Sequence, residues 1–273
     1  MKTRLLLFLI ILLQGNMLSA QDYQSHAKRA LELLEHDSLE QAETEIRKAL
    51  NLQPALKSNA ILFRYLGQIQ ERRGEFEKAL ESYGMGINLS PTTLGILLDR
   101  GSLHLRMNNE AKALSDYNEV LKLSPEHTEA LFFRAYIYTC QRLYKQARTD
   151  YENLIRKEPN NIKAWMGLIL LNDKDNRPNE AMEQMNAIIL QHPEDATLYA
   201  LRAGMKEDRK LYEDALSDLN KAIAIDDKNP EFRLLRACYY QRTKQKKLAK
   251  ADFEKAIELG ASPEEIVQLI QSK

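Results

Sequence analysis

The feature that most constrains the fold is an alanine that recurs at a nearly fixed interval along the chain. The interval is 37 residues once and 34 residues five times, and the positions are Ala42, Ala79, Ala113, Ala147, Ala181, Ala215 and Ala249. A small residue stands twelve positions before most of these marker alanines, and a large apolar residue stands four positions after each. A period of this length is typical of repeat architectures, in which each repeat stacks on its neighbours.

Within a repeat, apolar residues follow a helical spacing twice. In the fourth repeat Leu131, Ala135 and Tyr138 are spaced by four and three residues, and a second run follows the polar break at Gln141 and Arg142. Proline ends the second run in the first five repeats. This spacing is that of an amphipathic helix, and the polar break and the proline interrupt it. Each repeat is therefore predicted to be two antiparallel helices joined by a short turn.

This arrangement of small, aromatic and proline positions resembles the tetratricopeptide repeat family, whose repeats are 34-residue helical hairpins. The resemblance extends from about Tyr23 to Pro263, and Trp165 stands where the family has its tryptophan. The pattern departs from the family at Ile169, which replaces a small residue, and near 55–59, where three extra residues lengthen a junction. The resemblance implies an all-α fold, a right-handed α-solenoid of about seven hairpins. The array is predicted over 21–263, with repeats at about 23–56, 60–93, 94–127, 128–161, 162–195, 196–229 and 230–263.

The first residues of the chain do not follow the repeat. Lys2 and Arg4 precede an apolar run at Leu5–Leu13, and the small residues Ser19–Ala20 follow it. Nine helical residues span about 14 Å, which is too short for a bilayer core of about 30 Å. A basic head, a short apolar run and small residues predict a signal peptide over 1–20, with an uncleaved anchor as the alternative. We expect an exported protein, periplasmic first, with secretion or attachment to the envelope as alternatives.

The last residues predict a cap for the array. Gly260 is typical of a helix stop, and Ser262 followed by Pro263 is typical of a helix start. Ile266 and Leu269 then fall on one helical face. An open array needs an element that covers its last apolar surface, so 264–273 is predicted to be a short capping helix.

An arginine and an acid recur sixteen residues apart in five of the seven repeats. The pairs are Arg29 with Glu45, Arg100 with Asp116, Arg134 with Asp150, Arg202 with Asp218 and Arg236 with Asp252. The other two repeats have Leu66 with Ser82 and Leu168 with Gln184, so neither charge occurs without the other. The turn lies midway between the two positions, so antiparallel helices bring them opposite each other. Since a buried charge without a partner is costly, we expect structural ion pairs, with ligand-binding arginines as the alternative.

The sequence contains no pattern that indicates an enzyme, a metal site or a cofactor. The five histidines lack metal-ligand spacing, and no Gly-rich phosphate loop or nucleophile motif occurs. Cys140 and Cys238 lie three repeats apart, too far for a disulfide, so both are predicted to be free thiols. Lys plus Arg equals Asp plus Glu at 39 each, which leaves no basic surplus for nucleic acid. The chain is therefore predicted to be non-catalytic, with no cofactor, no metal and no nucleic-acid partner.

The exposed face of the first helix in each repeat is the candidate binding surface, because the resemblance implies that this face lines a concave groove. Its predicted residues are Arg64, Gln68, Leu98, Ser102, Phe132, Tyr136, Met166 and Leu170. The same apolar side chains could instead pack between repeats. The first repeat has Ala27 and Leu31 on this face, so the family's clamp for a C-terminal carboxylate is not expected.

These observations predict a non-catalytic scaffold that binds a peptide or a helix of a partner protein in the groove, through apolar anchors. Two alternatives remain open: an accessory subunit that recruits substrate to an enzyme, and a receptor for a small ligand or a glycan. No transmembrane span is expected after removal of the signal peptide.

Overall fold

The computed structural model describes residues 20–271, and these form two compact units. The N-terminal unit ends at Gln141 and the C-terminal unit begins at Arg142, and each is described by itself. The predicted signal peptide, apart from Ala20, lies outside the described residues. Within the described part of the chain, no helix is long and apolar enough to cross a membrane.

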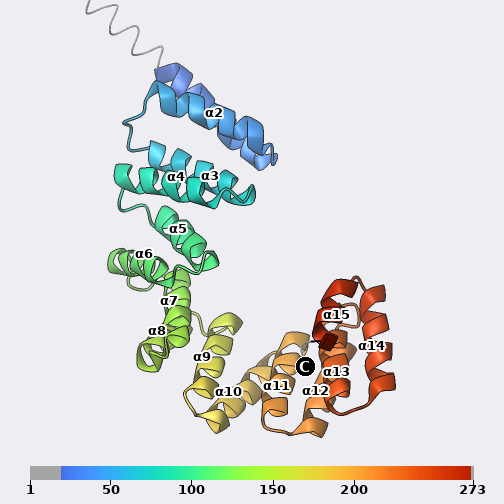
Figure 1. The fold of residues 1–273 in the computed structure, drawn as a ribbon. Helices are drawn as coiled ribbons and strands as arrows, with labels where there is room; N and C mark the ends of the chain where they lie inside the picture. The colour runs from blue at the N-terminus through green and yellow to red at the C-terminus, as the bar shows by residue number, and fades with distance from the viewer. Residues whose placement is uncertain (1–19, 272–273) are drawn as a thin grey trace, which may run out of the picture. The chain divides into compact units, whose positions relative to one another are not determined.

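The N-terminal unit consists of successive helices joined by short turns (Figure 1). A helix over 20–35 is followed by α2 (Leu39–Leu52), α3 (Asn59–Arg72), α4 (Phe76–Leu89), α5 (Leu94–Arg106), α6 (Glu110–Leu123) and α7 (Thr128–Cys140). The two helices of a repeat pack on each other, as α3 does on α4 and α5 on α6.

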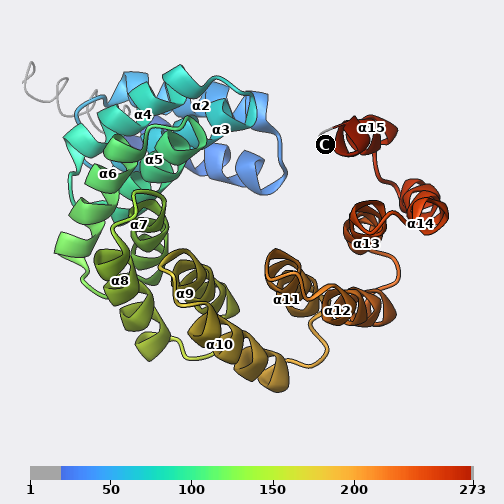
Figure 2. The same cartoon turned by 60° about the horizontal axis from the view of Figure 1, so that its bottom comes forward.

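The C-terminal unit continues in the same way (Figure 2). Its helices are α8 (Tyr144–Lys157), α9 (Ile162–Lys174), α10 (Pro178–Gln191), α11 (Ala196–Asp208), α12 (Tyr212–Ile225), α13 (Pro230–Arg242), α14 (Lys246–Glu258) and α15 (Pro263–Gln271). Every regular element within 20–271 is a helix, so the predicted all-α fold of paired helices is confirmed.

One residue with a positive φ angle ends the first helix of every repeat. These residues are Asp37, Gly74, Asn108, Arg142, Asn176, Lys210 and Lys244, each five positions before a marker alanine. After α11, the amide of Lys210 donates to the carbonyl of Glu207 (2.8 Å), and the amide of Leu211 donates to that of Lys206 (2.9 Å). This bonding closes a helix end through one left-handed residue. The same backbone turn therefore forms whether the residue is glycine, asparagine or lysine.

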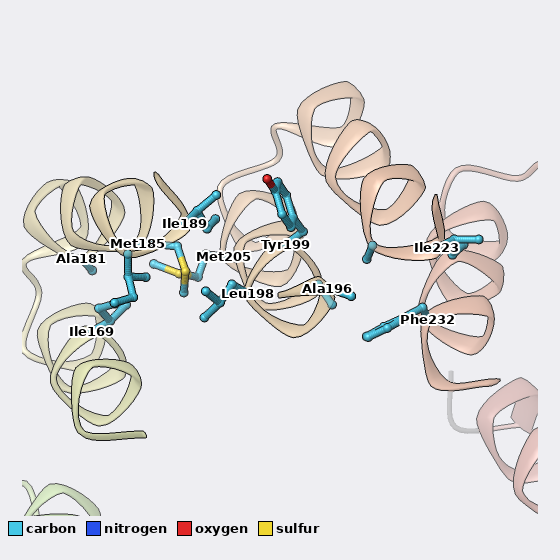
Figure 3. Packing of buried hydrophobic residues seen from close by; sticks show 13 residues of the cluster. Ile169, Ala181, Met185, Ile189, Ala196, Leu198, Tyr199, Met205, Ile223 and Phe232 are labelled. Carbon is cyan, nitrogen blue, oxygen red and sulfur yellow. The ribbon is translucent and has the colours of Figure 1, made fainter. Parts of the chain in front are cut away.

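Small residues make room for aromatic rings on the facing helix. A Cβ atom at Gly67 would lie 2.4 Å from the ring of Tyr83, which is fully buried. In the fifth repeat Ile169 replaces the small residue, and the facing position holds the flexible Met185 in place of an aromatic ring. Ile169 and Met185 lie together in the core shown in Figure 3. The departure at Ile169 is thus matched by a change in its neighbour.

The same kind of contact joins each repeat to the next. An apolar residue of the following first helix packs on the marker alanine and on the large residue four positions later. In Figure 3, Met205 of α11 lies beside Met185 of α10, in the same core cluster as Ala181. Tyr239 packs in the same register on Ala215 and Leu219, as does Leu103 on Ala79 and Tyr83. Each repeat therefore depends on its successor to cover its apolar end.

Candidate functional site

A polar side chain occupies the same position of the second helix in all seven repeats, three residues after the marker alanine. The residues are Glu45, Ser82, Asp116, Asp150, Gln184, Asp218 and Asp252. All except Gln184 are buried, with 3–6% of their surface exposed. Because an unsatisfied polar group is costly at this depth, each requires a partner.

Three of the predicted Arg–Asp pairs form bidentate bonds within a repeat. Nε and Nη2 of the arginine donate to the two carboxylate oxygens at 2.6–2.9 Å in the pairs Arg100–Asp116, Arg202–Asp218 and Arg236–Asp252. The hydrogen bond to the carboxylate raises the pKa of Arg202 and of Arg236. Parallel bonds of this kind fix the orientation of both groups as well as their distance.

The first repeat differs from the prediction. Glu45 is bonded to His26 Nδ1 (2.5 Å) and to Lys48 Nζ (2.8 Å), while Arg29 is exposed on the same helix as His26, so the expected Arg29–Glu45 pair is corrected. The longer glutamate reaches these groups, and the bonds from Lys48 and His26 lower its pKa. In the fourth repeat, Arg134 belongs to the N-terminal unit, where its Nη1 donates to Asn118 (2.9 Å), and Asp150 is buried in α8 of the C-terminal unit, so the Arg134–Asp150 pair stays a prediction.

The two repeats without charges satisfy this position with a neutral bond. Ser82 Oγ donates to Gln70 Oε1 (2.7 Å), and Asn172 Nδ2 donates to Gln184 Oε1 (2.8 Å). Gln70 and Asn172 each stand one helical turn after the leucine that replaces arginine. The sequence analysis did not predict these bonds. The amide side chain four residues after each leucine is the sequence feature that could have indicated them.

Several arginines also connect one repeat to the one before it. Nη1 donates to an asparagine two residues beyond the polar position of the preceding repeat, in the pairs Arg134–Asn118 (2.9 Å), Arg202–Asn186 (2.8 Å) and Arg236–Asn220 (2.6 Å). In Arg202 and Arg236 all three guanidinium nitrogens therefore donate to protein acceptors. The sequence analysis missed this link between repeats.

A cleft of about 590 Å³ lies on the first-helix face of the N-terminal unit. It is lined by Gln68, Glu71, Arg72, Tyr83, Leu98, Asp99, Ser102, Arg106 and Glu129, from α3, α4, α5 and α7. Three of the eight predicted groove residues, Gln68, Leu98 and Ser102, are thus brought together. Most of the other lining residues are charged, whereas the sequence predicted a groove with apolar anchors.

Arg64 positions Asp99, one of the residues that line this cleft. Its Nε donates to Asp99 Oδ2 (2.7 Å) and its Nη2 to Asp99 Oδ1 (3.3 Å), while Gln68 Nε2 also donates to Oδ2 (2.8 Å). The bond to Asp99 raises the pKa of Arg64. Arg64 therefore fixes Asp99 and does not itself line the cleft.

Glu71 lies at the centre of a second network in the cleft. Tyr83 donates its hydroxyl proton to Glu71 Oε1 (2.5 Å), and Arg106 Nη1 donates to Oε2 (2.8 Å). Burial raises the pKa of Glu71, and the charge of Asp99 adds to this, against the lowering by Tyr83 and Arg106. The cleft thus presents fixed hydrogen-bonding groups of both signs, which suits a polar ligand better than an apolar one.

The apolar groove residues have separate surroundings. Phe132 is partly buried with its ring at 5.4 Å from that of Phe133, whereas Tyr136 is 50% exposed, and the adjacent Cys140 raises its pKa. Met166 packs against the core of the C-terminal unit, and Leu170 is largely exposed. Phe132 and Tyr136 belong to the N-terminal unit, and Met166 and Leu170 belong to the C-terminal unit.

The described residues contain no group of three or more His, Cys, Asp or Glu placed to hold a metal ion. Cys140 is exposed and Cys238 half-buried, and neither of them forms a disulfide bond.

Comparisons with known proteins agree on the repeat. Sequence models of the tetratricopeptide repeat match residues 27–85, 98–143, 141–204 and 230–260. The structure is similar to that of a tetratricopeptide repeat protein from Parabacteroides merdae ATCC 43184, with 28% identity, a TM-score of 0.80, and coverage of 92% of this chain and 98% of that one.

Two more distant structures show the fold alone. PilW, described as a widely conserved type IV pilus biogenesis factor, is 16% identical, with a TM-score of 0.61 and coverage of 74% of this chain and 92% of PilW. MamA is 17% identical, with a TM-score of 0.58 and coverage of 65% of this chain and 96% of MamA. No curated protein sequence matches this chain.

Proposed function

Because the chain is a tetratricopeptide repeat protein, we propose that it is a non-catalytic scaffold that binds a peptide segment of a partner protein in the cleft of α3, α5 and α7. Proteins of this family mediate protein–protein interactions. The observation that carries the proposal is the cleft itself, because it gathers side chains from three successive first helices onto one surface.

The lining of the cleft fits a peptide main chain. Every residue of an extended peptide presents a donor and an acceptor, and both need partners when they leave water. Ser102 and Gln68 supply neutral groups, Arg72 and Arg106 supply donors, and Glu129 supplies an exposed acceptor. The peptide is therefore bound by polar contacts along its length, with a negative group placed beside the arginines.

One apolar anchor is available beside these polar groups. Tyr136 stands seven residues after Glu129, and thus two helical turns further along the same face of α7. Its half-exposed ring offers apolar area at low entropic cost. The sequence predicted several apolar anchors. In this proposal Tyr136 is the apolar anchor, and Leu98 forms the apolar floor of the cleft.

The proposal is tested by closing the cleft. Ser102→Trp places an indole among the lining residues, and Gly204→Trp is the matched control at the equivalent position of the sixth repeat, where an added Cβ meets nothing within 4 Å. Both variants and the unchanged chain are immobilised, and the proteins retained from an extract of the native cells are quantified by mass spectrometry. We expect Gly204→Trp to keep the partner and Ser102→Trp to lose it. Equal retention by Ser102→Trp contradicts the proposal.

A small polar ligand such as a glycan is the competing occupant, because about 590 Å³ lies within the range of small-molecule sites. Native mass spectrometry of the chain purified from those cells separates the two. A bound small molecule that is absent from Ser102→Trp, together with no retained protein, favours the receptor over the scaffold.

We also propose that the chain is exported, and periplasmic. The support is the order of Lys2, Arg4, the apolar run Leu5–Leu13 and Ser19–Ala20 in the sequence. N-terminal sequencing of the protein isolated from native cells tests this. A mature chain that begins at Gln21 is expected, and one that begins at or near Met1 contradicts it.

A further inference from the structure

An apolar depression of about 500 Å³ lies against α14, with Gln241 of α13 in its lining. Its lining on α14 consists of Lys246, Ala249, Lys250, Phe253, Glu254 and Ile257. Figure 2 shows α14 at the edge of the C-terminal unit, with α13 beside it. Within the part of the chain that the structure describes, no element fills this depression.

Earlier repeats show what occupies the corresponding surface. Met205 lies in one core cluster with Ala181 and Met185. After Ala249 and Phe253 the residue in the same register is 273, outside the described residues, and Ile266 packs with Ala249 and Phe253 from α15. The residue eight positions after the marker alanine is buried in four earlier repeats, as Leu50, Leu121, Ile189 and Ile223. At the end of the array this residue is Ile257, and it is 42% exposed. α15 brings Ile266 into the core with Phe253 and leaves Ile257 uncovered.

The charges on this face are separated along the helix. Lys246 and Lys250 stand in the first half of α14, and Glu254 and Glu258 stand in the second, at four-residue spacing on one side of the helix. This order opposes the helix dipole, which favours acids at the start of a helix and bases at its end. Lys250 and Glu254 form an ion pair at 3.7 Å, and Glu258 pairs with Lys255 at 2.7 Å. Because ion pairs this exposed contribute little stability, these charges can exchange their partners for those of a second molecule.

We propose that a second copy of this chain covers the depression, with the two α14 helices antiparallel about a two-fold axis near Asp252. Lys250 then lies opposite Glu254 of the second copy, and Lys246 lies opposite Glu258. Ile257 of each copy enters the depression of the other beside Ala249. The basic start of each helix then faces the acidic end of the other. These opposite charges offset the unfavourable interaction of each helix with its own dipole.

The charge pattern is what selects a second copy over another partner. A helix that is basic in one half and acidic in the other is complementary to itself in the antiparallel direction, as a two-fold interface requires. Thirteen residues of helix span only about 20 Å, which is short for an interface of standard size. The dimer is therefore weak and sensitive to salt.

Sedimentation equilibrium of the full chain at low salt, over a wide concentration range, tests the proposal. A reversible dimer is expected, weakened about tenfold by Lys250→Glu and about tenfold by Glu254→Lys, because each change occurs twice in the dimer and sets like charges opposite each other. An equimolar mixture of the two variants restores the affinity, because opposite charges then face each other across the interface. Ile257→Gln also weakens the dimer, and far-UV circular dichroism checks that each variant is folded.

The matched control is Lys221→Glu on α12, an exposed lysine whose replacement makes the same change in net charge away from this face. It should leave the dimer intact. A chain that stays monomeric at every concentration overturns the proposal, and so does a dimer whose two charge variants fail to restore each other when mixed.

Discussion

A buried polar position at one site of a helical hairpin can be satisfied by different chemistry in different repeats. Asp116, Asp218 and Asp252 use arginine, Glu45 uses histidine and lysine, and Ser82 uses an amide. What the repeats share is the requirement for a bonded partner, because an unpaired group at this depth loses its hydration without compensation. The residue types at the two positions therefore change together.

Arg100→Leu should destabilise the N-terminal unit by about 3 kcal/mol, because Asp116 remains buried without its cation. The triple change Arg100→Leu, His104→Gln and Asp116→Ser reproduces the second repeat, where Gln70 bonds Ser82. It should recover most of the loss. Thermal unfolding followed by circular dichroism measures both. A triple variant no more stable than Arg100→Leu contradicts the interpretation of this position.

His104 should make the N-terminal unit sensitive to mild acid. It is buried with Nδ1 unpartnered among the described residues, and burial lowers its pKa despite the attraction of Asp116. The unfolded chain then binds a proton more readily than the folded one, so stability is complete above the ordinary histidine pKa of about 6.5 and falls as the pH decreases through it.

The measurement is the melting temperature at pH 7.5 and pH 5.0 of the unchanged chain and of His104→Gln. On acidification, the melting temperature of the unchanged chain should fall further than that of His104→Gln. The control is His36→Gln, at an exposed histidine, which should behave as the unchanged chain does. Identical losses in His104→Gln and the unchanged chain would rule out this role for His104.

At this scale the sequence predicted the Arg–Asp pairs, because both members keep fixed positions in the repeat. It did not predict His26 as the partner of Glu45, or the bonds from arginines to Asn118, Asn186 and Asn220. These partners depend on the reach and rotamer of single side chains, and a period in the sequence does not specify them. The polar cleft was missed for the same reason, because Glu71, Arg72 and Arg106 lie outside the two positions chosen on each helix.

At the scale of the element, each first helix stops at a left-handed residue. Helical periodicity and the polar breaks predicted the helices and their turns, but not that Lys210 and Lys244 take a conformation that glycine and asparagine prefer. The backbone bonds of the turn, and the packing of the helices on either side, override that local preference in these repeats. Local propensity alone could not give this result.

Lys210→Gly should therefore stabilise the chain by about 1 kcal/mol, and Gly74→Lys should destabilise it by a similar amount, because only the backbone preference changes. An added Cβ at Gly74 meets nothing within 4 Å, so no clash contributes to the second value. Denaturant unfolding measures both. Two shifts of the same sign would show that side-chain contacts, and not the φ angle, decide the effect.

At the scale of the whole chain, each repeat covers the apolar end of the one before it, which leaves two kinds of surface for binding. One is the first-helix face, where the N-terminal unit forms its polar cleft. The other is the end of the array at α14, where no further repeat covers Ile257 within the described residues. The period predicted the repeats and the need for a cap, whereas the extent of coverage by α15 required the structure.

The most direct measurement of the central claim, that the cleft and not another exposed surface binds the partner, is photo-crosslinking in native cells. A photoreactive phenylalanine replaces Tyr136, the aromatic anchor beside the cleft, or Leu190 of α10, which is 82% exposed and the most exposed large apolar residue of the described chain. We predict a crosslinked partner from position 136 and none from position 190. Crosslinking from position 190 with none from position 136 would contradict the account.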